Sequence, residues 1–326
     1  MTAGRLVIPF FAVFLLLVAC DQAPTWKAEH FRDHPLAGRI WHVTEARFIT
    51  RSELHDELSL ADYILLGETH DNPDHHLLQA EIVTAMATAG RRPVLAFEMF
   101  DQSQASELEA YLSTSSGDAS GIAEAVRWNQ SGWPDWAIYQ PVAAAGLRAG
   151  LTLHTASMGR SDARLLLQSG ITGTLPKRFQ RLHLDRPLPK MLKVSLRREI
   201  EHAHCGYAPK EMISAMAFAQ FARDAHMALR ISNSGQEDGA ILIAGAGHVR
   251  NDRGVPFHLR RMAPGSGIVS LGFIEIIDTG SNASAYSDYF GSNTMPFDFI
   301  WFTPRVDIRD ACERFKEQLE KMKGAN

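Results

Sequence analysis

The chain has 326 residues, of which 45% are hydrophobic and 21% are charged, and it contains 24 glycines and 15 prolines. This composition is typical of a globular protein and excludes a disordered, collagen-like or disulfide-framework chain. A formal net charge of −4 gives no basic field for nucleic acid, so we expect no nucleic-acid partner. Three cysteines are too few for a disulfide scaffold or a thiolate metal cluster.

The N-terminus has the pattern of a processed leader. Arg5 precedes an apolar run over 6–18, which is too short to span a bilayer and has the length of a signal-peptide core. The run ends in Leu-Val-Ala-Cys at 17–20, which resembles a bacterial lipoprotein signal with cleavage before Cys20 and lipid on its thiol. The alternative is a plain secretory signal with an accidental cysteine. We therefore predict a signal peptide over 1–19, a tether over 20–40, and a membrane anchor through lipid on Cys20 outside the cytoplasm.

The two remaining cysteines would then lie in a compartment that permits disulfides. Cys205 and Cys312 either form a disulfide or are free buried thiols, and their spacing leaves both alternatives open.

From residue 61, short apolar runs alternate with segments of helical periodicity. Asn72-Pro73 is typical of a helix start, and another predicted helix begins near Pro209. The predicted strands cover 63–66, 93–97, a segment starting at 151–153, 240–244, 268–277 and 297–302. Further helices are predicted over about 102–112, 136–149 and 307–323.

This alternation of strands and helices defines the expected fold class. The strands are apolar on successive residues, which is typical of strands buried on both faces. We predict an α/β domain over 41–326, with a largely parallel sheet covered by helices on both faces and a helical insertion over about 160–234.

Polar side chains follow three of the predicted strands. Glu68 and His70 come after the first strand, Glu98 ends the second, and His248 follows the strand at 240–244. Because ligands bind beyond the carboxyl ends of parallel strands, we expect these four side chains to converge. They could share general acid and base duties as catalytic residues, or Glu68, His70 and His248 could bind a divalent metal ion. In the alternative interpretation, the glutamates cap helices and the histidines make buried hydrogen bonds.

Two further groups of side chains could bind a flat, iron-containing ligand. His204 and Tyr207 are candidate haem-iron ligands because imidazole and tyrosinate both coordinate iron, although a polar loop before a helix explains them equally well. Four aromatic residues within 128–139 could line a slot, but such clusters more often anchor a loop in a core; they are Trp128, Trp133, Trp136 and Tyr139.

Taken in order, several motifs resemble those of the ChaN-like haem-binding lipoproteins of the Tiki superfamily. The motifs are Gly67-Glu68-Thr69-His70-Asp71-Asn72-Pro73 with His75-His76, Phe97-Glu98-Met99-Phe100, Gly132-Trp133-Pro134, His204-Cys205-Gly206, Ala219-Gln220 with Arg223-Asp224, Gly245 to Arg250 with Asp252, Gly254-Val255-Pro256, and Trp301-Phe302-Thr303-Pro304-Arg305. The resemblance implies an α/β fold, haem binding at the bacterial envelope, and a role in haem or iron acquisition.

The resemblance also implies an alternative activity. The wider superfamily includes metal-dependent hydrolases with two G-x-x-H motifs and a glutamate, and Gly67–His70 and Gly245–His248 match these motifs. We therefore predict a haem-binding lipoprotein that holds or passes haem without turnover. The alternatives are a metal-dependent hydrolase of esters or peptides and a structural module with a relic pocket. We expect a homodimer, because a one-sided site for a flat ligand is often completed by a second subunit.

Overall fold

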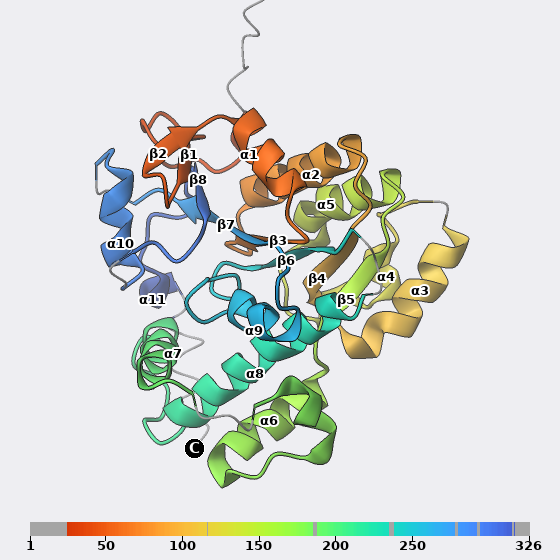
Figure 1. Cartoon of the computed structure of the whole chain (residues 1–326), viewed down its shortest axis with the longest axis vertical. Coiled ribbons are helices and arrows are strands. Elements are labelled where there is room, and N and C mark those ends of the chain that lie inside the picture. Colours follow the sequence, from red (N-terminus) through yellow and green to blue (C-terminus); the bar gives the residue numbers. More distant parts are fainter. Residues whose placement is uncertain are drawn as a thin grey trace, which may run out of the picture.

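The computed structural model describes residues 25–115, 117–184, 188–234, 238–277, 280–291, 294–314 and 316. An eight-stranded sheet with the order β2-β1-β8-β7-β3-β6-β4-β5 forms its centre (Figure 1). The strands are β1 (Ile40–His42), β2 (Arg47–Ile49), β3 (Tyr63–Glu68), β4 (Val94–Asp101), β5 (Leu153–Ser157), β6 (Ala240–Gly245), β7 (Ile268–Glu275) and β8 (Phe299–Thr303). The helices are α1 (Arg51–Ser59), α2 (Pro73–Thr88), α3 (Ala105–Thr114), α4 (Ile122–Ala125), α5 (Trp136–Arg148), α6 (Arg160–Thr172), α7 (Lys190–Ala203), α8 (Ile213–Ser232), α9 (Val255–Met262), α10 (Tyr286–Tyr289) and α11 (Ala311–Arg314).

The sheet is largely parallel, as the sequence predicts. Strands β3 to β8 pair in parallel, and only β1 pairs antiparallel, with β2 and with β8. The strand β6 lies between β3 and β4, so three strands that are distant in the sequence end side by side. Sequence patterns did not predict β1 and β2, because three-residue strands are too short to show a periodicity.

Helices cover both faces of the sheet. Ile64 and Leu66 of β3 pack into a core shared with α2 and α5, whereas Leu65 packs into a second core shared with α8 and α9. All six residues of β3 are buried, and so are all six of β6. Because successive side chains point to opposite faces of a strand, a continuous apolar run is required to fill both cores.

The predicted helical insertion consists of α6, α7, α8 and the 3₁₀ helix η3 (Lys177–Leu182). Two small apolar clusters hold these elements together, and α8 packs on α6, α7 and α9. The structure shifts two predicted boundaries: α8 begins at Ile213 rather than at Pro209, and the third strand covers Leu153–Ser157. Within the range 307–323 of the predicted C-terminal helix, the structure has the short helix α11. Residue 315 and residues 317–323 lie outside the described residues.

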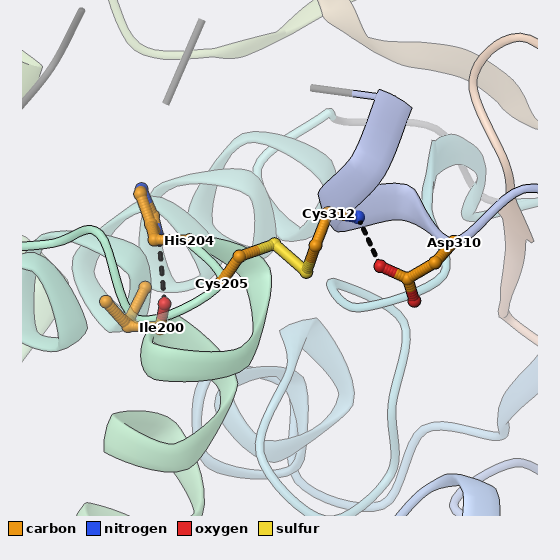
Figure 2. The surroundings of a disulfide bond; sticks show 5 residues. All are labelled: Ile200, His204, Cys205, Asp310 and Cys312. Atoms are coloured by element: carbon orange, nitrogen blue, oxygen red, sulfur yellow. Dashed lines mark hydrogen bonds between the residues drawn. A yellow bond between two sulfur atoms is a disulfide. The ribbon is translucent and has the colours of Figure 1, made fainter. Parts of the chain in front are cut away.

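The two cysteines of the domain form a disulfide. Cys205, after α7, and Cys312, in α11, are bonded with their Cα atoms 5.6 Å apart (Figure 2). Of the two alternatives that the spacing left open, the structure therefore has the bonded one. The bond connects segments 107 residues apart in the sequence and holds the end of α7 against the C-terminal part of the described chain.

The predicted signal peptide and Cys20 lie outside the described residues. Within the predicted tether, the chain from residue 25 onward already packs on the domain. The backbone N–H groups of Lys27 and Ala28 donate to the Asp74 carboxylate at 2.8 and 2.9 Å, and Leu36 is buried. In the described part of the chain, every helix is too short or too polar to cross a bilayer.

Candidate functional site

The carboxyl ends of β3, β6 and β4 meet at one edge of the sheet, and the predicted convergence is confirmed there. Glu68 is aligned with Gly245 across the β3–β6 pair, and the backbone N–H of Gly245 donates to Glu98 Oε2 at 2.9 Å. The strands can approach this closely because Gly67 has no side chain. A Cβ atom there would lie 2.3 Å from Val249 Cγ2.

Glu68 is the centre of the first polar cluster. Its Oε1 atom lies 3.0 Å from His70 Nδ1 and accepts from the Tyr139 hydroxyl at 3.0 Å. Its Oε2 atom lies 3.2 Å from His76 Nδ1 and accepts from Gln79 Nε2 at 2.7 Å. Glu68 is 3% exposed, so these four partners replace the water that a buried carboxylate loses.

The Glu68 carboxylate favours the charged form of the two histidines beside it. Burial by itself would raise the pKa of the Glu68 carboxyl, but His76 and His70 outweigh it and lower that pKa. Burial likewise opposes the charge on His76, but Glu68 overcomes it and raises the pKa of His76. His76 Nε2 faces the His70 carbonyl oxygen at 3.1 Å, so both of its ring nitrogens face acceptors, as an imidazolium requires.

Glu98 is the centre of the second cluster. Its Oε1 atom accepts from Arg223 Nη2 at 2.9 Å and lies 3.1 Å from His248 Nε2. The other ring nitrogen, His248 Nδ1, lies 2.5 Å from Asp224 Oδ1. His248 is therefore held between two carboxylates, with Gln220 Nε2 3.3 Å from its ring.

This arrangement fixes the charge of His248. Burial would lower its pKa, but Glu98 and Asp224 outweigh burial and raise the pKa of His248 to about 10. Burial raises the pKa of Asp224 to about 6, against the opposing effect of His248. Near neutral pH the buried set of Glu98, Asp224, His248 and Arg223 therefore has two negative and two positive charges, which offset one another.

The two clusters face each other across Gly245. A Cβ atom on Gly245 would lie 2.9 Å from His70 Nε2 and 3.7 Å from Glu98 Oε2. The side chain of His70 is 35% exposed, so its Nε2 atom combines a fixed orientation with access to solvent. Glu68 binds the other ring nitrogen, which is the arrangement that orients an imidazole for proton transfer.

Beside these clusters, a cleft of about 540 Å³ opens at the ends of β4 and β5. Glu98 and Arg223 line it together with Trp133, whose ring centroid lies 4.7 Å from that of His70. The cleft therefore adjoins the second cluster directly and the first cluster through Trp133.

Several residues of the site were not among the predicted site residues. The sequence does contain a signal for three of them, because Gln220, Arg223 and Asp224 have the i, i+3, i+4 spacing of one helix face in an otherwise apolar helix. Tyr139 belongs to the aromatic cluster within 128–139 of the sequence. In the structure it is part of the hydrophobic core and also binds Glu68. Of the other aromatics in the cluster, Trp128 and Trp136 are buried in the core.

The structure does not support the predicted metal site. Glu68 and His70 belong to one cluster and His248 to the other, and each is hydrogen-bonded within its own cluster. Among the residues that the structure describes, no three His, Cys, Asp or Glu side chains are grouped as metal ligands. Glu68 and His248 have hydrogen-bond partners on both of their polar atoms, and His70 is bound to Glu68 through Nδ1, so we assign no step to a divalent metal ion.

The candidate haem ligands His204 and Tyr207 belong to the segment between α7 and α8. Figure 2 shows His204 next to the disulfide of Cys205. His204 Nδ1 lies 2.8 Å from the Ile200 carbonyl oxygen, and both candidate side chains are half-buried. A turn joins the two residues, with the Tyr207 N–H donating to the His204 carbonyl oxygen at 2.8 Å, and no described contact connects them to Glu68, Glu98 or His248.

Comparison with known proteins identifies the family. Residues 54–259 match the family model described as haem-binding uptake, Tiki superfamily, ChaN. A solved structure described as "Cofacial heme binding to ChaN of Campylobacter jejuni" has a TM-score of 0.62 and 19% identity, covering 80% of this chain and 95% of that chain. At this identity the likeness shows the fold.

Two other solved structures have TM-scores too low to carry an argument. The structure of the type III effector HopBA1 has a TM-score of 0.36 and 15% identity, and the match covers 77% of this chain and 91% of that chain. A mutant of the erythromycin esterase EreC has a TM-score of 0.43 and 14% identity, and the match covers 79% of this chain and 95% of that chain. No curated protein matches the chain. Because the family model covers more than half of the sequence, the chain belongs to the ChaN family of haem-binding uptake proteins in the Tiki superfamily.

Proposed function

We propose that this protein binds haem at the bacterial cell envelope and holds or passes it during haem or iron acquisition, without chemical turnover. The observation that carries this proposal is the match to the haem-binding family over 54–259. The structurally similar ChaN of Campylobacter jejuni is described as binding haem cofacially, which supports the same function here.

We assign the iron to the segment between α7 and α8. Tyr207 offers an oxygen donor and His204 a nitrogen donor, and both kinds of donor coordinate haem iron. The adjoining helix α7 exposes Met191 by 77% and Val194 by 37% in its first two turns, at the end of the helix far from the ligands. Arg197 and Arg198 are exposed on the same helix and carry the charge that propionates require.

The envelope location and the dimer extend this proposal. Lipid on Cys20 would tether the domain, and the Cys205–Cys312 bond suits an oxidising compartment. Because haem has two faces and α7 offers one exposed side, we propose that a second copy of the chain covers the other face. The cofacial arrangement named for Campylobacter jejuni ChaN supports this.

Absorption titration with hemin tests the haem proposal. We expect a Soret shift that saturates near stoichiometry. Tyr207→Phe and His204→Gln should change the position of the Soret band, because each removes a candidate ligand. Tyr289→Phe and His183→Gln, which alter exposed side chains elsewhere, serve as matched controls. Absence of a saturable shift in the unaltered protein would refute haem binding, and identical spectra for all variants would refute the ligand assignment.

A second candidate function is hydrolysis of an ester or peptide by general acid–base catalysis. It is favoured by one observation: Glu68 orients His70 through Nδ1, while His70 Nε2 faces the gap toward Glu98 and is accessible. In this role His70 would remove a proton from an attacking water and return it to the leaving alcohol or amine as the ester or peptide bond breaks. The charged Arg223, which lines the cleft, would stabilise negative charge on the substrate oxygen.

The pH profile of hydrolysis tests this role of His70. The pKa of His70 is raised, since Glu68 and Glu98 outweigh burial, and a base must be neutral. Hydrolysis should therefore increase as the pH rises above the usual range of histidine, and His70→Asn and Glu68→Gln should abolish it. His183→Asn, on the exposed surface, is the matched control. No hydrolysis across an ester and peptide panel, or a rate that falls with pH, would refute the proposal.

A further inference from the structure

The cleft at the ends of β4 and β5 contains charged groups that the proposed haem site does not use. Three arginines line it, Arg127, Arg160 and Arg223, against the carboxylates of Glu98 and Asp101. The lining therefore has one surplus positive charge, although the chain as a whole has a net charge of −4. A local field of opposite sign to the net charge of the molecule concentrates anions at that place.

Both carboxylates of the cleft are already satisfied by the protein. Glu98 is bound by Arg223, His248 and the backbone of Gly245. Asp101 caps the 3₁₀ helix η1 (Gln102–Gln104), accepting from the backbone N–H of Ser103 at 2.7 Å. Of the other two arginines, Arg127 pairs with Glu107, so Arg160 is the arginine of the lining without a carboxylate partner among the described residues.

These two arginines retain donors for a ligand. Arg160 uses one terminal nitrogen, Nη2, for the carbonyl oxygens of Gln130 and Ser131 at 3.0 and 3.1 Å. Arg127 pairs with Glu107 at 3.1 Å through one nitrogen, and its side chain is 65% exposed. Its backbone has a φ of +52°, an uncommon conformation for a residue other than glycine, and this conformation occurs where the chain lines the cleft.

The start of α6 adds backbone donors to the same wall. Its N-cap residue, Gly159, has no side chain to accept from the first turn, and Gly159, Arg160 and Ser161 all line the cleft. Within the described residues, no acceptor is found for the backbone N–H groups of Arg160 and Ser161. An oxyanion bound beside Arg160 would meet these N–H groups and the positive end of a 13-residue helix.

Other residues of the lining suit an apolar or aromatic body. Trp133 is half-buried there, and Met99 and Met158 complete this side. A volume of about 540 Å³ is that of a small-molecule site. The one arginine left without a carboxylate partner, Arg160, matches a carboxylate monoanion better than a phosphate, which has close to two negative charges at neutral pH.

We propose that this cleft binds a small carboxylate-bearing molecule, with its carboxylate on Arg160, Arg127 and the start of α6 and its apolar body against Trp133. The bound molecule would lie beside Glu98 and Arg223, and thus next to the two polar clusters. The site shares no residue with the haem ligands proposed at His204 and Tyr207. It therefore extends beyond haem binding.

Calorimetric titration of the protein with 1-naphthoate, 1-naphthamide and 1-naphthyl phosphate tests this site. We expect the carboxylate to bind and the neutral amide to bind at least about tenfold more weakly, since the charge-assisted hydrogen bonds are lost. Arg160→Gln should lower the affinity for naphthoate by about tenfold or more, whereas Arg160→Lys should retain part of that affinity. Arg178→Gln is the matched control, because Arg178 pairs with Asp162 of the same helix and does not line the cleft.

Equal binding of acid and amide, or equal affinities of the Arg160→Gln and Arg178→Gln variants, would overturn the proposal. Stronger binding of the phosphate than of the carboxylate would overturn the assigned ligand class. A hemin titration of the same variants separates the two proposals. If hemin displaces naphthoate, or if Arg160→Gln alters the Soret titration, the cleft is not a separate site. If hemin does not bind while naphthoate does, haem binding fails and the carboxylate site stands.

Discussion

The sheet edge and the segment after α7 are positioned by different means. At the sheet edge, Glu68 and Glu98 are at least 97% buried. Glu68 is paired in register with Gly245, and Glu98 follows Phe97, the last residue of β4 that is paired with β6. The segment with His204 and Tyr207 is half-buried and follows a helix that packs on a small satellite cluster. One covalent bond, Cys205–Cys312, connects it to a distant part of the chain.

This difference suggests different ways in which each region would lose its geometry. Buried charges at the sheet edge depend on all their partners, because a lost partner leaves an uncompensated charge in a water-poor environment. The segment after α7 depends mainly on a crosslink that restricts the unfolded chain. The following predictions are arranged by the size of the effect that we expect.

Removal of a buried carboxylate should have the largest effect. Glu98→Ala leaves His248, Arg223 and the backbone N–H of Gly245 without their shared acceptor. We expect a loss of about 3–5 kcal/mol in the free energy of unfolding, measured by urea denaturation. Glu107→Ala removes a carboxylate that pairs with Arg127 on the exposed surface and should lower the free energy of unfolding far less. Similar losses in the two variants would show that the Glu98 cluster is not a buried network.

Removal of the disulfide should have the second-largest effect on the free energy of unfolding. The paired substitution Cys205→Ser with Cys312→Ser releases a loop closed over a sequence separation of 107 residues. We expect a loss of about 2–4 kcal/mol, and the unaltered protein in reductant should match the variant. The affinity of this variant for hemin should fall more than that of Glu107→Ala, because the crosslink adjoins the proposed haem ligands. Unchanged stability and unchanged haem binding would show that the bond does not position the segment.

Measured over a single pH unit, the dependence of stability on alkaline pH should be the smallest effect. The pKa of His248 rises from 6.5 to about 10 on folding, so its protonation stabilises the fold fully below pH 6.5. This contribution is lost as the pH rises through about 10. We expect the melting temperature to fall between pH 7 and pH 10, and to fall less steeply in His248→Gln. Parallel profiles in the two proteins would mean that His248 does not titrate in this way.

Local sequence patterns predicted much of the fold but only part of the site. The strand at 63–66 and the helix after Asn72-Pro73 are found as β3 and α2, because burial and capping act within a few residues. The partners of Glu68 and Glu98 were harder to predict. Tyr139 and Asp224 come from α5 and α8, and only packing brings them to the sheet edge.

The sequence by itself determined the fold class, because apolar runs and turn residues encode strands and helices locally. It also determined which residues follow the strands, and its ordered motifs carried the resemblance to the family that the family model matches. Only the tertiary structure decided which carboxylate faces which imidazole, since a hydrogen bond depends on ångström-scale distances between distant segments. It also decided between bonded and free Cys205 and Cys312, because a disulfide requires two Cβ atoms to come together in space.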